Sequence, residues 1–342
     1  MKEYKDLYTE DISKASVYRR NYLSSVYDLA DSVLTEKSKI REEYITPVKL
    51  KNNREKYISD FKEIIGKPLF DRKKHNDVQK IFVGCDGQGY IYRLVFNFEK
   101  NIKFCGLLFV PFDVKEKIPL VIAIHGGEGT PELISDMYGQ NYYSHIVRRL
   151  LDRNVAVFAP QLLIWDGKRF GDSFDRFEID AKYKALGSSL TAFECECIIG
   201  ALDYLIQADF VDSEKIGITG LSYGGYYSIV TAVLDERIKA VYSSCVFNDR
   251  AKYSRPDFVY KNMFEKFLDA ETVALIYPRA VYIEAGKRDC FFSLDGAEKE
   301  YERLKKYYSG QKNNLVFKIT DSGHKYDDED EGIEFLINKL NN

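Results

Sequence analysis

Residues 214–230 read EKIGITGLSYGGYYSIV, an apolar run that leads through closely spaced glycines into a helix-like segment. Such a run predicts a buried strand followed directly by a helix. A serine at a strand-to-helix turn adopts strained backbone angles, and Gly220 and Gly224 remove the Cβ atoms that would clash there. We therefore expect the hydroxyl of Ser222 to stand exposed above a sheet, beside the N-terminus of the next helix.

Further apolar runs precede and follow this one, separated by segments of helix length. They are PLVIAIH (119–125), NVAVFAP (154–160), IKAVYSSCV (238–246), RAVYIEAG (279–286) and LVFKIT (315–320). Continuous apolar strands that alternate with helices predict an α/β fold with a mostly parallel central sheet flanked by helices. Because such sheets bind ligands outside the carboxyl ends of their strands, Ser222 lies where an active site is expected.

The chain before these runs shows different sequence patterns. Residues 12–69 have a rather polar helical pattern interrupted at Pro47, whereas residues 79–110 read as an antiparallel strand meander. We expect an N-terminal helical arm over 1–78 and a catalytic domain over 79–342. The arm could wrap its own domain, cover the mouth of the active site or pair with another subunit.

A serine hydroxyl is a weak nucleophile unless a histidine takes its proton and a carboxylate orients that histidine. Of the four histidines, His75 lies in a charged segment and His145 in a predicted helix, where a packing or surface role is expected. His324 follows the last strand-like run, the place where this architecture requires the base. We predict that His324 is catalytic.

The orienting acid is expected after a strand between the serine and the histidine. Asp289, in EAGKRDCFF, meets this condition, and Asp249, in VFNDR after the preceding strand, is the competitor. We favour Asp289. Without these companions, Gly-x-Ser-x-Gly would be no more than a glycine-rich turn that packs a strand on a helix.

A second set of glycines follows the first central strand, in His125-Gly126-Gly127. Backbone without side chains can approach a substrate carbonyl there, so we expect the N–H groups of Gly127 and Tyr223 to form an oxyanion hole. His125 then serves the structure of the loop. A tight strand-to-loop turn would need the same glycines.

Together HGG, GLSYGG, Asp289 in GKRDC and His324 in SGH resemble an α/β-hydrolase over about residues 79–342. Three segments resemble the dienelactone-hydrolase-like and acetyl-xylan-esterase-like branch: REKYISDFKEIIGKPL, GLLFVPFDVKEKIPLVIAIHGGEGTPEL and ALDYLIQADFVDSEKIGITGLSYGGYYSIVTAVLDERIKAVYSS. Dienelactone hydrolases proper carry cysteine at the position of Ser222, in the sharp strand-to-helix turn that we call the elbow. The serine here implies an ordinary serine esterase that forms an acyl-enzyme and requires no metal or organic cofactor.

Substrate choice depends on the walls around the serine. The segment 161–190 is too long for an ordinary loop and carries Trp165 and Asp166, which could overhang the site. The segment 247–258, which begins at Phe247, is a second candidate wall, and Phe291 follows the expected acid. Aromatic faces with carboxylates suit a sugar ring, and the resemblance implies acetylated carbohydrate, although clustered aromatics also form plain core.

Two other classes of function stay open. The elbow also resembles that of prolyl-oligopeptidase-like serine peptidases, but those carry a large N-terminal propeller, and only about a third of this chain precedes HGG. The fold could also serve as a non-catalytic interaction module. Turnover of acyl esters separates the module from the esterase, and turnover of peptide anilides identifies the peptidase.

Charge and cysteine usage exclude several partners. The net charge is −3 and the pI is about 6.0, with no concentrated basic face, so nucleic acid is not an expected partner. The six cysteines are scattered, and Cys195 and Cys197 read as helix residues rather than a metal site. The N-terminus lacks the apolar region of a signal peptide, and no stretch is long enough to span a bilayer. We expect a soluble cytoplasmic protein.

Overall fold

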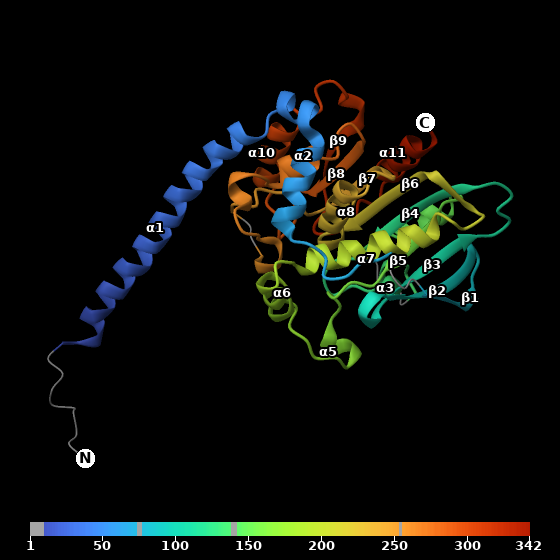
Figure 1. The fold of residues 1–342 in the computed structure, drawn as a ribbon, viewed down its shortest axis with the longest axis horizontal. Helices are drawn as coiled ribbons and strands as arrows, with labels where there is room; N and C mark the ends of the chain where they lie inside the picture. The colour runs from blue at the N-terminus through green and yellow to red at the C-terminus, as the bar shows by residue number, and fades with distance from the viewer. Residues whose placement is uncertain (1–9, 74–76, 138–141, 253–254) are drawn as a thin grey trace, which may run out of the picture.

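The computed structural model describes residues 10–73, 77–137, 142–252 and 255–342 (Figure 1). They form a nine-stranded sheet with helices on both faces. The strands are β1 (Asp77–Cys85), β2 (Gly89–Phe98), β3 (Ile102–Pro111), β4 (Ile118–Ile124), β5 (Ala156–Pro160), β6 (Val211–Leu221), β7 (Ile238–Ser244), β8 (Ala280–Gly286) and β9 (Leu315–Thr320).

The strand order is β1-β2-β3-β5-β4-β6-β7-β8-β9. The pairs from β1 to β5 are antiparallel, and all pairs from β5 to β9 are parallel. This confirms the predicted parallel sheet with an antiparallel N-terminal part. Ile124 of β4 lies in register with Gly220 of β6, so the turns that follow these two strands meet at one edge of the sheet.

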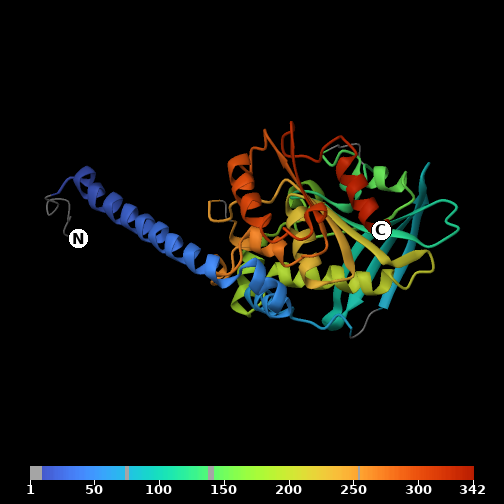
Figure 2. The same ribbon diagram turned by 90° about the horizontal axis from the view of Figure 1, so that it is seen from above.

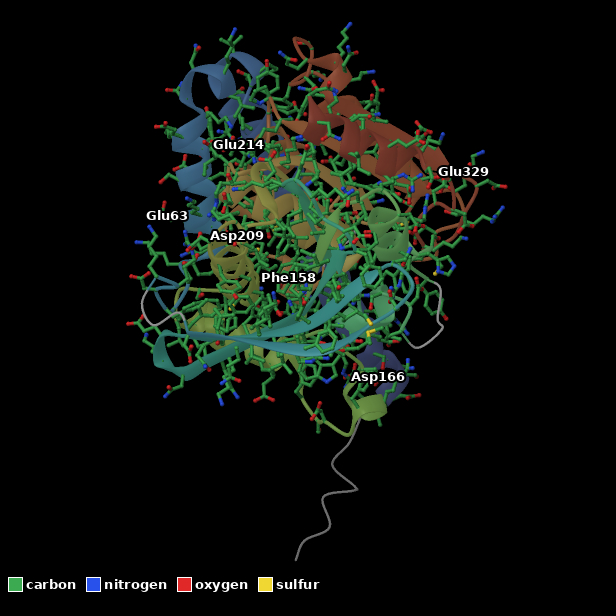
Figure 3. The ribbon with its side chains drawn as sticks, turned by 90° about the vertical axis from the view of Figure 1, so that its right-hand side faces the viewer. Glu63, Phe158, Asp166, Asp209, Glu214 and Glu329 are labelled. Carbon is green, nitrogen blue, oxygen red and sulfur yellow. The ribbon has the colours of Figure 1, made fainter. Side chains whose placement is uncertain are left out.

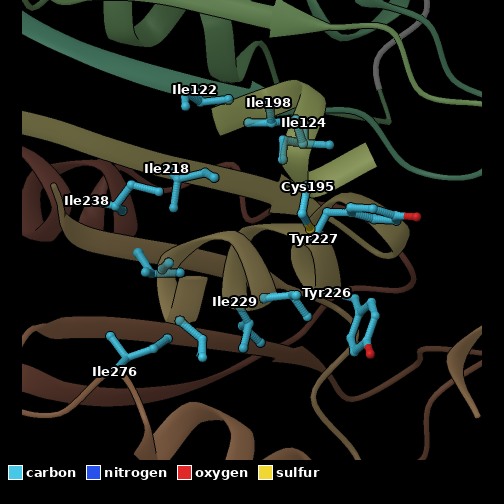
Figure 4. Close-up of a cluster of buried hydrophobic side chains, with 14 of the residues drawn as sticks. Ile122, Ile124, Cys195, Ile198, Ile218, Tyr226, Tyr227, Ile229, Ile238 and Ile276 are labelled. Atoms are coloured by element: carbon cyan, nitrogen blue, oxygen red, sulfur yellow. The ribbon is translucent and has the colours of Figure 1, made fainter. Parts of the chain in front are cut away.

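The central strands are buried on both faces, and their successive side chains enter two separate cores. On β4, Ile122 and Ile124 face the larger core and Val121 faces the smaller one. Helices α7 (Leu190–Leu205) and α8 (Tyr223–Leu234) cover the larger core, where Cys195 packs among isoleucines and tyrosines (Figure 4). Helices α4 (Ile146–Leu151) and α11 (Glu331–Asn341) cover the smaller core.

Five further short α-helices complete the described fold. They are α3 (Pro131–Ile134), α5 (Gly167–Phe170), α6 (Arg176–Ala185), α9 (Asp269–Ala274) and α10 (Leu294–Leu304). Helices α5 and α6 fill the segment 161–190, which is therefore an ordered insertion. No single described helix is long and apolar enough to cross a membrane, although the bent pair α6 and α7 meets the length and composition requirement when counted together.

Two helices precede the sheet and differ in their surroundings. Helix α1 (Ile12–Tyr44) extends away from the body, whereas α2 (Pro47–Ile65) lies against it (Figures 1 and 2). Pro47 does interrupt the helical pattern as predicted, and it does so as the first residue of α2, where its missing N–H costs nothing. Thr46 caps α2 by accepting a hydrogen bond from the Lys49 N–H.

Candidate active site

The turn between β6 and α8 brings Ser222 to the carboxyl edge of the sheet. Its φ is 57° and its ψ is −118°, a conformation that L-residues rarely adopt. A Cβ on Gly220 would lie 2.1 Å from the backbone of Gly224, and a Cβ on Gly224 would lie 2.0 Å from the Ile124 oxygen. Both glycines are therefore required by close backbone approach, as the sequence predicted.

His324 lies in the loop after β9 and pairs with Asp289, which follows β8. The His324 Nδ1 is 2.8 Å from the Asp289 Oδ2, and the Asp289 side chain is 2% exposed. The other carboxylate oxygen accepts hydrogen bonds from the N–H groups of Phe291 (2.8 Å) and Phe292 (3.1 Å). These bonds fix the plane of the carboxylate and direct its free oxygen at the imidazole.

The competing acid, Asp249, is bonded within its own turn. Its carboxylate accepts a hydrogen bond from the Ala251 N–H at 3.1 Å. Within the described residues, the carboxylate that contacts the His324 ring is that of Asp289. The geometry thus favours Asp289 over Asp249 as the partner of the histidine.

A cavity of about 570 Å³ joins the serine to the histidine. It is lined by Gly126, Gly127, Glu128, Tyr142, Tyr143, Leu221, Ser222, Tyr223, Arg255, Cys290, Phe291, Phe292 and His324. The His324 ring lies between two aromatic rings, edge to face with Phe291 at 4.8 Å and stacked on Phe292 at 5.7 Å. These contacts restrict the imidazole to one orientation at the cavity wall.

The loop after β4 lies directly against the elbow. The N–H of Gly126 donates to the Tyr143 hydroxyl at 3.1 Å, which holds the loop in place. A Cβ on Gly127 would lie 3.4 Å from the Tyr223 ring. Among the described residues, the N–H groups of Gly127 and Tyr223 have no hydrogen-bond partner, and both residues line the cavity. The arrangement suits two donors for a developing oxyanion.

Comparisons with known proteins agree with this architecture. The sequence model of the prolyl oligopeptidase family matches residues 190–281. Mouse dipeptidyl peptidase 8 is 30% identical over 141 residues, which is 40% of this chain and 14% of that protein. The chain covers less than half the length of the curated relatives it matches.

Solved structures match far more of the chain. The glucuronoyl esterase from Solibacter usitatus has a TM-score of 0.62 at 15% identity, covering 84% of this chain and 91% of that one. Acetyl xylan esterase 1 from Thermoanaerobacterium sp. JW/SL YS485 has a TM-score of 0.56 at 14% identity, covering 89% and 98%. The chain has the α/β-hydrolase fold.

Within this fold, the histidine that follows β4 has a structural role. His125 is fully buried, and burial lowers its pKa to about 4. The Leu162 N–H points at its Nε2 at 3.1 Å, so that nitrogen carries no proton, and Nδ1–H donates to the Gly126 oxygen at 3.0 Å. The ring therefore braces the loop that carries Gly127, in agreement with the role expected from the sequence.

Among the described residues, His145 does not line the cavity. The His145 Nδ1 lies 2.9 Å from the Asp136 carboxylate, and its side chain is exposed. His75 lies outside the described residues. Neither changes the assignment of the base.

The four predicted pocket residues have different outcomes. Phe291 lines the cavity and is 51% exposed. Phe247 is 2% exposed and does not line the cavity, because its side chain packs into the larger core. Trp165 packs on Phe174 with ring centroids 4.6 Å apart and is likewise absent from the cavity wall.

Asp166, the fourth predicted pocket residue, does not line the main cavity either. It caps α5 by accepting from the Lys168 N–H, at the edge of the molecule seen in Figure 3. It also lines a smaller cavity of about 270 Å³ that shares Gly127 and Tyr143 with the main one. The insertion thus borders the site without covering Ser222.

Sequence reasoning missed several cavity residues, of which Arg255 is the most polar. Its Nη1 is 3.3 Å from the Tyr223 hydroxyl, and its guanidinium lies 5.4 Å from that ring. Arg255 belongs to the segment 247–258 that the sequence singled out as a wall, but the wall residue is this arginine and not Phe247. Tyr143 comes from a turn before α4, and no local pattern connects it with Gly126.

One set of side chains could also bind a metal. The ligand atoms of Cys245, Asp289 and His324 lie within 4.8 Å of one another. Asp289 and His324 already bond each other, and the Cys245 sulfur lies 3.4 Å from the Lys325 carbonyl oxygen. The set is fully accounted for by an acid–base pair and a buried thiol.

Proposed function

We propose that the protein is a serine carboxylic-ester hydrolase with Ser222, His324 and Asp289 as its triad. The observation that carries the proposal is the shared cavity, which is lined both by a serine on a strained elbow and by a histidine held by a buried carboxylate. The elbow strain supports a functional role, because a turn that merely packed a strand on a helix would not need a non-glycine residue at φ 57°.

The first half of the reaction forms an acyl-enzyme. Ser222 Oγ attacks the ester carbonyl carbon while its proton passes to His324 Nε2. Asp289 accepts the Nδ1–H bond, which fixes the tautomer that leaves Nε2 free to take the proton. The N–H groups of Tyr223 and Gly127 stabilise the oxyanion, and the protonated imidazole gives its proton to the departing alcohol.

The second half repeats these steps with water. His324 takes a proton from a water molecule, which attacks the acyl carbonyl, and the same two N–H groups hold the oxyanion. Collapse releases the carboxylic acid and returns the proton to Ser222 Oγ. These steps use the chain's own side chains and need no metal or organic cofactor.

We propose short-chain acyl esters, acetyl esters of carbohydrates among them, as substrates. Support comes from the fold similarity to an acetyl xylan esterase and a glucuronoyl esterase over most of the chain. The exposed Phe291 ring at the cavity offers an apolar face on which a sugar ring can stack.

A serine peptidase is the second candidate, favoured by the match to the prolyl oligopeptidase family. That match spans residues 190–281, so it contains Ser222 but neither Asp289 nor His324. A non-catalytic module is the third candidate, and measured turnover separates all three.

The test is hydrolysis of p-nitrophenyl acetate and p-nitrophenyl octanoate by the purified protein and by Ser222→Ala. We expect acetate to be the better substrate and the variant to lose at least about a thousandfold in kcat. Ser213→Ala, an exposed serine on the same strand, is the matched control and should keep full activity. Cleavage of dipeptidyl anilides without ester turnover would identify a peptidase, and no turnover of either would refute the proposed esterase.

A further inference from the structure

The outer part of α1 is a helix without any covering element. Figures 1 and 2 show it extending from the body with nothing beside it. Only its last turns are anchored, by the Lys37–Glu265 ion pair at 2.7 Å and by Arg41 donating to the Phe264 oxygen at 2.6 Å. Residues 12–36 thus form a free helix about 37 Å long at 1.5 Å per residue.

This free helix carries large apolar side chains that are all exposed. They are Ile12, Val17, Tyr18, Tyr22, Leu23, Val26, Tyr27, Leu29 and Val33, with exposed fractions from 41% to 74%. Exposed apolar residues scattered singly are ordinary, but nine on one element need an explanation.

Four of these apolar residues lie along one side of the helix. Tyr22, Val26, Leu29 and Val33 are separated by four, three and four residues, the spacing that places side chains along one stripe. Alternating steps of three and four also match the seam by which two helices pack side by side. The stripe therefore has the pattern of a helix that packs against another helix.

Local interactions do little to stabilise this helix. Its free part contains the charged residues Lys14, Arg19, Arg20, Asp28, Asp31 and Glu36, none of which forms an ion pair with a described residue. Most helices in proteins are held by packing of an apolar face. A second helix along the stripe would supply such packing to the outer part of α1.

The charges identify the partner's direction. Residues 12–27 contain three basic and no acidic side chains, whereas residues 28–36 contain three acidic and no basic ones. A second copy of the helix running the opposite way, with Val26 opposite Leu29, places Tyr22 opposite Val33. It also places Arg19 at one end of the stripe opposite Glu36 at the other end. A parallel copy would oppose like charges at both ends, which is unfavourable.

We propose that α1 is a dimerisation arm that pairs with α1 of a second copy of this chain in antiparallel orientation. The arrangement has a two-fold axis, so each contact occurs twice and the interface closes on itself. The apolar stripes form the seam, and Arg19 of each copy lies opposite Glu36 of the other. This inference does not depend on the proposed enzymatic activity.

An anionic membrane is the other surface that an amphipathic helix can cover. Membrane-surface helices carry basic residues along their whole polar face, which attract anionic lipids. Here the three acidic residues would lie against the same lipid surface as the three basic ones and would be repelled. The segregation of charge along the axis favours a second copy of the chain.

Sedimentation equilibrium of the full-length protein tests the seam. We expect a dimer for the wild type and at least about a hundredfold increase in the dimer dissociation constant for Val26→Asp combined with Leu29→Asp. Ser24→Asp combined with Thr35→Asp places the same charges on the far side of the helix and should leave the dimer intact. A monomeric wild type, or equal effects of both variants, would overturn the proposal.

Charge reversal tests the antiparallel direction. Arg19 lies three residues before Tyr22 and Glu36 lies three residues after Val33, so both continue the stripe on the seam side of the helix. Arg19→Glu or Glu36→Arg alone should raise the dissociation constant about three- to tenfold at low salt, and the double variant should restore it. Additive weakening in the double variant would refute the antiparallel arrangement. A monomer that binds phosphatidylserine vesicles through the stripe would establish the membrane role instead.

Discussion

Asp289 is the residue at which the direction of each hydrogen bond matters most. One carboxylate oxygen is occupied by two backbone N–H groups, so the other must face His324 Nδ1. In Asp289→Asn, the amide oxygen keeps the backbone bonds and the amide NH₂ points at the imidazole. Nδ1 must then accept, the proton moves to Nε2, and the base can no longer take a proton from Ser222.

We therefore expect Asp289→Asn to lower kcat for p-nitrophenyl acetate by about 10⁴ with KM little changed. Asp249→Asn is the control, since that carboxylate only bonds its own turn, and should stay within about twofold of the wild type. Steady-state kinetics of both variants decide between the two acids. A larger loss in the Asp249 variant would reverse the assignment.

Glu284 is a second buried carboxylate whose ionisation matters, here for stability. It is 1% exposed on β8 and accepts hydrogen bonds from the Tyr242 hydroxyl, the Ser244 hydroxyl and the Asp327 N–H. Burial outweighs these bonds and raises the pKa of Glu284 from 4.5 to about 7. The folded protein thus retains a proton that the unfolded chain releases.

The sign of the pH dependence follows from this difference. Between about pH 4.5 and 7 the folded state binds more protons at Glu284 than the unfolded state, so the free energy of unfolding falls as pH rises. The loss from this group is complete above pH 7 and amounts to about 3 kcal/mol at most. Glu284→Gln, a neutral mimic of the protonated acid, should not show this part of the decline.

Urea unfolding at pH 5 and pH 8 measures the effect. From pH 5 to pH 8, we expect the free energy of unfolding of the variant to rise by about 2 to 3 kcal/mol relative to that of the wild type. Burial also raises the pKa of Glu300, which both proteins contain. Its contribution to the pH dependence cancels when the free energies of unfolding of the two proteins are subtracted. A constant difference across this range would show that Glu284 is ionised alike in both states.

At the scale of elements, the position of Ser222 depends on how closely α8 approaches β4. Gly224 lies in the first turn of α8, and a Cβ there would meet the Ile124 oxygen at 2.0 Å. A backbone oxygen inside a parallel sheet cannot rotate away as a flexible side chain could, so the helix itself would have to shift.

Gly224→Ala should therefore lower the free energy of unfolding by about 3 kcal/mol and reduce esterase activity strongly, because Ser222 moves with the helix. Gly87→Ala, in the turn between β1 and β2, has open space around its Cβ and serves as the control. Urea unfolding and p-nitrophenyl acetate turnover should leave the control close to the wild type. Retained stability in Gly224→Ala would mean that α8 can move without cost.

The elements also show what sequence patterns can predict. The elbow glycines, the strand runs and the order of Ser222, Asp289 and His324 are local signals, since each follows from residue types next to a strand end. The inward turn of Phe247 and the contact of Tyr143 with Gly126 arise when distant segments pack together. Such contacts leave no periodicity or motif in the chain.

The insertion 161–190 illustrates the same limit. The length of this segment predicted an insertion here, but no sequence pattern predicted the contacts that hold it against the body. Arg176 is buried and bonds the Asp257 carboxylate at 2.7 Å, the Tyr227 hydroxyl at 2.6 Å and the Glu194 carboxylate at 3.1 Å. One arginine thus joins the insertion, α7, α8 and the segment that carries the cavity wall.

For the whole molecule, the two N-terminal helices serve different purposes although both were predicted as one arm. Helix α2 places Leu50, Tyr57, Phe61 and Ile65 in the larger core, each at most 5% exposed. Helix α1 buries only Arg41. The packing of α2 therefore stabilises the body itself, whereas the apolar side chains of the outer α1 would be buried in the proposed dimer.

Two truncations separate these roles. Removal of residues 1–36 keeps the Lys37 and Arg41 anchors, so the body should retain its melting temperature and its esterase activity while the dimer is lost. Removal of residues 1–78 exposes the surface that α2 covers. Four buried apolar side chains at about 1.5 to 3 kcal/mol each approach the total stability of a typical domain, so this form should fail to fold.

Near-ultraviolet circular dichroism, thermal melting and sedimentation of the two truncated forms provide the measurements. A shorter form that stays dimeric would place the interface on the body and not on α1. A folded, active protein from residue 79 onward would show that α2 is dispensable and that the catalytic domain begins where the strand pattern does. Loss of folding in the first form would mean that the outer α1 stabilises the body through the second copy, since no described helix or strand of its own chain lies beside that part.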